Sequence, residues 1–116
     1  GVNADTTRRR LGALRDEIAA RAASVDEALA ALTRDRASAN DDDEHDPEGV
    51  PLSAEWSRLQ ALRDAAADES RQVDAAFERL DAGTYGVCAG CGQPIPAGRL
   101  EVRPFAEYCV ACAERR

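Results

Sequence analysis

The sequence predicts a mainly α-helical protein, built as a long antiparallel helical hairpin with an acidic tip and a small cysteine-rich module after it. Three observations lead to this prediction. Large apolar residues recur every seven positions in two long segments. The excess of acidic residues is confined to the break between those segments, and all four cysteines follow the second segment.

The first helix is expected from about Thr6 to Ala39, because this stretch is rich in Ala, Arg, Glu and Leu and lacks proline. A spacing of seven residues indicates one stripe, the seam of a coiled coil. The members of this stripe are Leu11, Ile18, Val25 and Leu32. Gly12 destabilises a helix by about 1 kcal/mol relative to Ala, which favours a late start.

The second helix is expected from about Ser53 to Ala82, with Ser53 placed to cap its first turn and Gly83 placed to end it. Its seam also advances in sevens, through Leu52, Leu59, Ala66, Val73 and Leu80. Neither helix can bury its stripe alone, so the two are expected to pair antiparallel. Trp56 is expected to close the apolar end of the hairpin.

The predicted tip loop covers residues 40–51, where Pro47, Gly49 and Pro51 oppose helix formation. The formal net charge of the chain is −7. Six acids lie close together in this loop: Asp41, Asp42, Asp43, Glu44, Asp46 and Glu48. Sixteen acids and fifteen arginines remain elsewhere, so nearly all the imbalance belongs to the tip. An arm of about thirty residues, at ~1.5 Å rise per residue, would hold the tip roughly 45 Å from its base.

Two interpretations of the acidic tip remain open: a solvated loop that keeps the hairpin soluble, or a functional surface. An EF-hand is rejected, because counting from Asp41 places Asp46 and Leu52 where Gly and Glu are needed. Weak magnesium binding stays possible. His45 is interpreted as a solvated loop residue, since no Ser or Cys partner lies near it in sequence.

The cysteines, Cys88, Cys91, Cys109 and Cys112, follow the spacing Cys-x2-Cys-x17-Cys-x2-Cys of a four-thiolate zinc site. Gly90 and Gly92 are expected to permit the tight backbone of the first pair. The surrounding segment has too few large apolar residues to fold without a metal. Four protein ligands leave no open position, so we predict one structural Zn²⁺. Two disulfides or a redox-active thiol pair are the alternatives, and a reducing compartment favours metal.

The net charge, the motifs and the distribution of apolar residues exclude several classes of function. The acidic balance argues against a protein that mainly holds nucleic-acid phosphates, as a zinc-ribbon nucleic-acid binder would. No nucleophile and base pair, phosphate loop or open metal site indicates an enzyme. No apolar run reaches the length of a membrane span and no signal-peptide pattern is visible, so a cytoplasmic location without membrane contact is expected. The predicted domains are residues 1–83, the hairpin, and 84–116, the zinc finger with a short terminal helix.

A longer pattern in the finger resembles the DksA/TraR family of bacterial transcription regulators. It reads Tyr85-Gly-x-Cys88-x-x-Cys91-Gly-x-x-Ile95-x-x-x-Arg99-Leu100-x-x-x-Pro104-x-x-x-x-Cys109-x-x-Cys112. The resemblance implies a protein that binds RNA polymerase directly, without DNA contact, and inserts its coiled coil through the secondary channel towards the catalytic magnesium. Family members of the DksA type carry an Asp-x-x-Asp-x-Ala motif at the tip, which assigns that role here to Asp43 and Asp46.

The tip also departs from the family pattern, because Glu48 stands where the family has Ala and Pro47 follows the second aspartate. Asp41, Asp42 and Glu44 add further charge. A response to the alarmone ppGpp, which family members sense through basic residues, is not carried over, since the chain contains no lysine.

The hypothesis is a monomeric regulator of RNA polymerase. The alternative is a zinc-stabilised coiled-coil adaptor with a different partner, or a homodimer formed through an exposed seam. Four arginines of the finger either face an acidic partner or are ordinary surface residues: Arg99, Arg103, Arg115 and Arg116.

Overall fold

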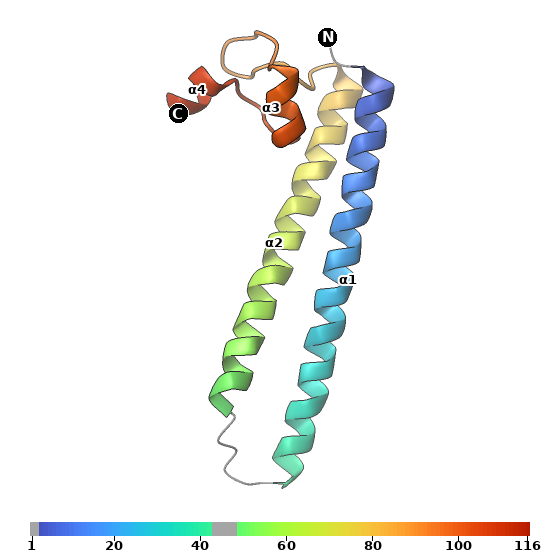
Figure 1. Ribbon diagram of the computed structural model, residues 1–116, viewed down its shortest axis with the longest axis vertical. Helices are drawn as coiled ribbons and strands as arrows, with labels where there is room; N and C mark the ends of the chain where they lie inside the picture. The colour runs from blue at the N-terminus through green and yellow to red at the C-terminus, as the bar shows by residue number, and fades with distance from the viewer. Residues whose placement is uncertain (1–2, 43–48) are drawn as a thin grey trace. The chain divides into compact units, whose positions relative to one another are not determined.

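The structure is a computed structural model that describes residues 3–42 and 49–116, with only the backbone described for 36–42 and 49–52. The described residues form four helices: α1 (Ala4–Asp42), α2 (Gly49–Ala82), α3 (Ala97–Val102) and α4 (Val110–Glu114). Figure 1 shows α1 and α2 running side by side in opposite directions. The predicted helical hairpin and the short terminal helix are therefore confirmed.

The first helix begins at Ala4, before Gly12, so the expected late start was wrong. Asn3 caps this end: its side-chain oxygen accepts a hydrogen bond from the backbone N–H of Thr6 at 3.1 Å, and its carbonyl accepts one from Thr7 at 2.9 Å. Leu11 and Thr7 are buried in the first turns. Burial of these side chains outweighs the weak helix propensity of a single glycine.

The second helix begins at Gly49, four residues before the predicted cap Ser53, which is exposed inside the helix. Pro51 is tolerated because it lies in the first turn, where a backbone N–H has no partner within the helix. The first helix in turn continues to Asp42. Both ends of the predicted 40–51 loop are thus helical.

The end of α2 agrees with the prediction that Gly83 stops the helix. Gly83 has a φ of 78°, its N–H donates to the carbonyl of Leu80 at 3.2 Å, and the N–H of Thr84 donates to Arg79 at 2.8 Å. These two bonds form a Schellman motif, which needs the left-handed conformation that glycine adopts without strain.

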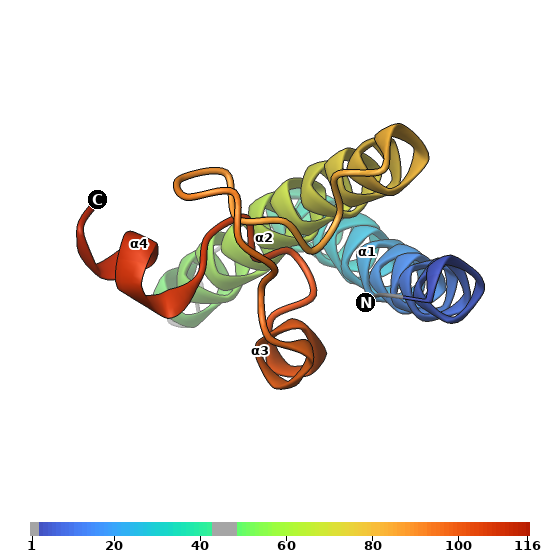
Figure 2. The same cartoon turned by 90° about the horizontal axis from the view of Figure 1, so that it is seen from above.

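The contacts of the chain divide it into two compact units. One unit is Glu17–Ser70, the part of the hairpin nearer the tip, and the other joins the residues up to Asp16 with Arg71–Arg116. The finger therefore shares a compact unit with one end of the hairpin. Figure 2 shows α3 and α4 lying apart from each other beside the irregular chain that connects them.

Within Glu17–Ser70, an apolar cluster of Leu29, Leu32 and Leu59 is covered by Val25, Ala28 and Trp56. Trp56 takes the predicted place at the apolar end of the hairpin. Ala66 and Ile18, from the two predicted seams, are also buried. The heptad spacing in the sequence therefore correctly identified the faces on which the two helices pack.

Ion pairs between α1 and α2 show the antiparallel register of the hairpin. Arg21 lies 2.9 Å from the carboxylate of Glu69, and Arg63 lies 3.4 Å from that of Asp26. In the other unit, Arg8 meets Asp81 at 2.7 Å and Arg15 meets Asp74 at 3.5 Å. As the residue number rises along one helix, it falls along the other. These pairs are exposed, so each contributes little stability, about 0–1 kcal/mol.

Within residues 3–42 and 49–116, no helix combines the length and the apolar character that a membrane span requires.

Substituting Leu11 tests the importance of the seam at this end of the hairpin. Leu11 is 1 % exposed, so Leu11→Ala is expected to lower the free energy of unfolding by about 2–5 kcal/mol. Leu62, 43 % exposed on α2, supplies the control: Leu62→Ala is expected to cost less than about 1 kcal/mol. Urea unfolding followed by circular dichroism measures both variants. Equal losses would contradict this assignment of the seam.

Candidate metal centre

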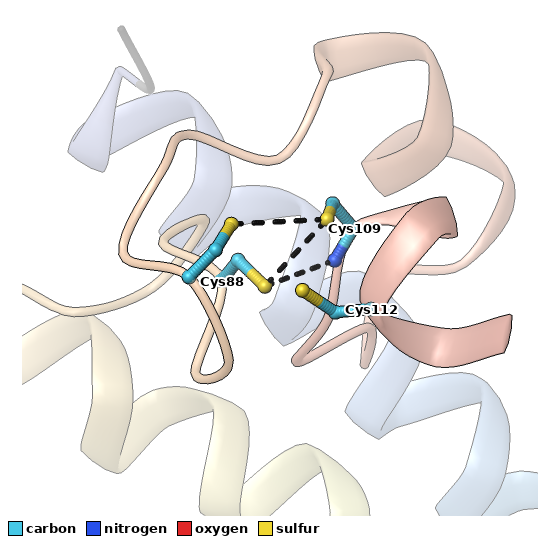
Figure 3. Close-up of side chains that lie close together, drawn as sticks. Cys88, Cys109 and Cys112 are labelled. Atoms are coloured by element: carbon cyan, nitrogen blue, oxygen red, sulfur yellow. Dashed lines mark hydrogen bonds between the residues drawn. The ribbon is translucent and has the colours of Figure 1, made fainter. Parts of the chain in front are cut away.

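All four predicted cysteines come together in the structure. Their sulfur atoms lie within 4.8 Å of one another, although the two pairs are seventeen residues apart in sequence. Cys88 and Cys91 belong to an irregular loop, Cys109 caps the N-terminus of α4, and Cys112 lies within α4. Figure 3 shows the sulfurs of Cys88, Cys109 and Cys112 directed toward one another.

The first cysteine pair lies on a short turn held by backbone hydrogen bonds. The N–H of Cys88 donates to Gln93 at 2.8 Å, that of Gly92 donates to Cys88 at 2.9 Å, and that of Ile95 donates to Gly86 at 2.7 Å. Gly86 and Gly92 have φ values of 81° and 76°, which a side chain would strain. The prediction for Gly92 agrees with this conformation, whereas the need for Gly86 was missed.

The second cysteine pair is joined to the first through the backbone. The N–H of Ala89 donates to the carbonyl of Glu107 at 2.8 Å, and the N–H of Cys109 donates to the sulfur of Cys88 at 3.3 Å. These bonds fix the distance between the two pairs, so the sulfurs are placed by the backbone as well as by their own side chains.

The distances between sulfurs fit a tetrahedral zinc site. Zinc at ~2.3 Å from each of four thiolates separates neighbouring sulfurs by about 3.8 Å. The Sγ atom of Cys109 lies 3.8 Å from that of Cys88 and 3.9 Å from that of Cys91. A disulfide would need about 2.0 Å, and all four cysteines are free. The site therefore holds one structural Zn²⁺, and the two-disulfide alternative does not apply.

The four thiols differ in their tendency to ionise. The pKa of Cys88 is lowered to about 6, mainly because the backbone N–H of Cys109 donates a hydrogen bond to its sulfur. The pKa of Cys112 instead rises to about 11, because the Arg115 side chain, which lowers it, is outweighed by the nearby thiols of Cys109 and Cys88. A divalent cation removes this competition, since coordination deprotonates a thiol outright.

Few apolar side chains support the cysteines. Ile95 and Leu100 are buried with Cys88 and Cys112, and the partly buried side chains packed against them are Tyr85, Ala106, Tyr108 and Cys109. The hydroxyl of Tyr85 donates to the carbonyl of Pro104 at 2.8 Å. Burial raises the pKa of this phenol, so it stays protonated and able to donate.

Three of the four finger arginines have partners within the finger. Arg99 Nε donates to the carbonyl of Tyr108 at 2.9 Å, Arg115 donates to the sulfur of Cys112 at 3.5 Å, and the Arg116 guanidinium lies 4.5 Å from the centre of the Tyr108 ring. Arg103 is exposed, with no side-chain partner in the described part of the chain. Neither interpretation made from the sequence anticipated these internal contacts.

Most of the predicted acidic tip lies outside the part of the chain that the structure describes. Asp43, Glu44, His45, Asp46 and Glu48 lie outside the described residues. The other two acids, Asp41 and Asp42, belong to the last turn of α1, where only the backbone is described.

Gly90 approaches the metal site more closely than its sequence context suggested. A Cβ atom built on Gly90 would lie 3.0 Å from Sγ and 3.1 Å from Cβ of Cys112, and 3.5 Å from the Tyr108 ring. Its φ is not in the left-handed region. Glycine is therefore required here because a metal ligand occupies the space beside it.

Gly90→Ala is accordingly expected to displace Cys112 and to weaken zinc binding about 5- to 150-fold, because overpacking of this size costs ~1–3 kcal/mol. Gly98→Ala in α3 is the matched control, because nothing lies within 4 Å of a Cβ at that position. Competition with a zinc chelator measures the affinity of both variants. Wild-type affinity in Gly90→Ala would show that the contact with Cys112 carries no constraint.

Comparison with known proteins places this site in a family. Residues 83–116 match the model of the prokaryotic dksA/traR C4-type zinc finger. The chain is 39% identical over 67 residues to the RNA polymerase-binding transcription factor DksA of Caulobacter vibrioides, covering 54% of this chain and 46% of the relative. It is 36% identical over 50 residues to the protein of the same name from Haemophilus influenzae, covering 43% and 34%.

Among solved structures, transcription factor DksA2 from Pseudomonas aeruginosa resembles this chain with a TM-score of 0.83 and 28% sequence identity. The match covers 97% of this chain and 81% of that one. The chain spans less than half the length of the two curated relatives. Residues 83–116 therefore belong to the dksA/traR family of C4-type zinc fingers, and the hairpin and finger together resemble the fold of DksA2.

Proposed function

We propose that this chain is a transcription regulator that binds RNA polymerase directly. The observation that carries the proposal is the likeness to the transcription factor DksA2, because this likeness extends over hairpin and finger together. The curated relatives named RNA polymerase-binding transcription factors supply the partner. The zinc finger alone would support a much wider range of functions.

In this proposal the hairpin enters the secondary channel of the polymerase and carries its acidic tip towards the catalytic centre. The family resemblance supplies the route. The charge distribution supports it, because three arginines within Glu17–Ser70 are paired with carboxylates: Arg21 with Glu69, Arg58 with Glu55 and Arg63 with Asp26. Nearly all of the excess negative charge lies in residues 41–48.

Asp43 and Asp46 are the residues proposed to act at the tip, with Asp41, Asp42, Glu44 and Glu48 in supporting positions. Carboxylates close to a catalytic metal or to mobile elements around it change the electrostatic stability of the complex. Their effect is strongest in a channel from which bulk water is partly excluded. The proposed role is therefore regulatory, with no chemistry performed by this chain.

The alternative of a coiled-coil adaptor that dimerises through an exposed seam is less favoured. Leu11, Leu59 and Val73 of the two seams are already buried within a single chain. The described part of the hairpin exposes only Leu62 among its large apolar side chains. A second copy would therefore find little apolar surface to cover, which supports the proposal of a monomer.

Binding to purified bacterial core RNA polymerase tests the proposal directly. The zinc-loaded chain is expected to bind saturably, and a competitor that occupies the secondary channel is expected to reduce the binding. Fluorescence anisotropy of a labelled chain measures both effects. Absence of binding would refute the polymerase partner, whereas binding that the competitor leaves unchanged would refute only the route through the channel.

Exchange of the two tip aspartates separates binding from regulation. Asp43→Asn with Asp46→Asn is expected to change the dissociation constant by less than about threefold, below ~1 kcal/mol, and to abolish the effect on transcription in vitro. Asp35→Asn with Asp64→Asn removes the same two charges from exposed positions on the helices and is expected to regulate like wild type. Normal regulation by the tip variant would exclude the proposed role of these aspartates.

A further inference from the structure

A four-thiolate zinc site carries an excess of negative charge, because one Zn²⁺ does not neutralise four thiolates. Two of the four ligands are buried: Cys88 is 2 % exposed and Cys112 is 8 % exposed. Cys91 is exposed, so water can solvate its sulfur. Charge on a buried atom is costly unless a hydrogen bond or an opposite charge compensates it. The two buried sulfurs therefore need donors from the protein.

Backbone groups meet this need at Cys88. The N–H groups of Gly90 and Cys109 both donate to its sulfur, each at 3.3 Å. These donors come from the fold of the loop itself and do not depend on the identity of any side chain.

At Cys112 the donor is a side chain. Arg115 follows Cys112 by three residues, so the two side chains lie on the same side of one helical turn. Its guanidinium nitrogen lies 3.5 Å from the sulfur, within reach of an N–H···S hydrogen bond. Arginine adds a full positive charge to the donor, and a hydrogen bond between a charged donor and a thiolate is stronger than one between neutral groups.

Neighbouring contacts hold this part of the finger in place. The Arg116 guanidinium stacks on the ring of Tyr108 at 4.5 Å, and the carbonyl of Tyr108 accepts the Nε–H of Arg99 at 2.9 Å. The backbone N–H of Arg115 also donates to the carbonyl of Cys112 at 3.2 Å. Arg115 therefore follows a backbone whose path is fixed on both sides, which limits the entropy lost when its side chain meets the sulfur.

We propose that Arg115 is a positioning residue of the zinc centre, which compensates the charge on the buried Cys112 thiolate and so slows the release of zinc. The proposal concerns retention of the metal and does not depend on which partner the protein binds. Arginines close to zinc thiolates are then part of the metal site, although they do not ligate the ion.

The test compares zinc release from the full chain into excess chromophoric chelator. Outer-shell partners of metal sites commonly affect affinity 10–100-fold, and because Arg115 is exposed we expect Arg115→Gln to release zinc about five- to tenfold faster at low salt. Arg115→Lys keeps the charge and is expected to recover most of the wild-type rate. At about 1 M salt the difference between wild type and Arg115→Gln is expected to shrink, because salt screens an exposed charge.

Arg103→Gln is the matched control, since it removes the same charge from the same finger at an exposed position without a described side-chain partner. It is expected to release zinc at the wild-type rate. Equal acceleration in Arg103→Gln would overturn the proposal, because it would indicate a general effect of net charge. A wild-type rate in Arg115→Gln, or a faster rate that neither salt nor Arg115→Lys changes, would overturn it as well.

Cobalt substitution gives a readout that a loss of packing alone would not produce. A hydrogen bond to a thiolate lowers the energy of its lone pairs, so removing the bond is expected to shift the thiolate-to-cobalt charge-transfer band to lower energy. The shift is expected in Arg115→Gln and absent in Arg103→Gln. Identical spectra for wild type and Arg115→Gln would contradict the contact with Cys112.

Discussion

The bond between zinc and four thiolates is the interaction on which the finger depends. Of the four buried residues in its core, two are the ligands Cys88 and Cys112, and only Ile95 and Leu100 are ordinary apolar side chains. Full burial of such a side chain contributes about 1.5–3 kcal/mol. A structural zinc contributes on the order of 10 kcal/mol or more to a finger. The helices α3 and α4 have six and five residues, too few to be stable without this support.

Arg79, near the end of α2, connects the hairpin to the finger that zinc stabilises. Its guanidinium lies 3.6 Å from the carboxylate of Glu107 and 3.4 Å from the carbonyl of Phe105, while its own carbonyl accepts the N–H of Thr84 in the helix-ending motif. Arg10 of α1 lies 3.9 Å from Glu101 of α3. These contacts explain why the finger and one end of the hairpin form a single compact unit.

Charge is distributed differently in the two parts of the protein. Along the hairpin, several arginines pair with carboxylates of the facing helix, and the Arg15 guanidinium also lies 4.2 Å from the centre of the Phe77 ring. In the finger, arginines lie against a carbonyl, a ring and a zinc ligand. Nearly all of the excess negative charge lies in residues 41–48, whereas three of the four finger arginines have partners within the finger.

Local patterns in the sequence were sufficient for the hairpin, the four ligands and the end of α2. Seven-residue spacing identified Leu11, Ile18, Leu59 and Val73 as buried, because the period of a helix determines which residues share a face. The cysteine spacing identified the metal because two ligands of a close pair can reach one ion. Gly83 ended α2 because only a residue free to adopt positive φ completes that motif easily.

Tertiary structure decided the features that depend on residues distant in sequence. Burial of Leu11 overrode the effect of Gly12 on the start of α1, and the space occupied by Cys112 explains Gly90. α3 was not predicted, since it is short and packs Leu100 against the cysteines. The role of Arg115 also required the fold, because composition shows a cation but not the buried thiolate beside it. Periodicity and spacing depend on residues close together in the sequence, whereas these contacts join residues that approach one another only after the chain has folded.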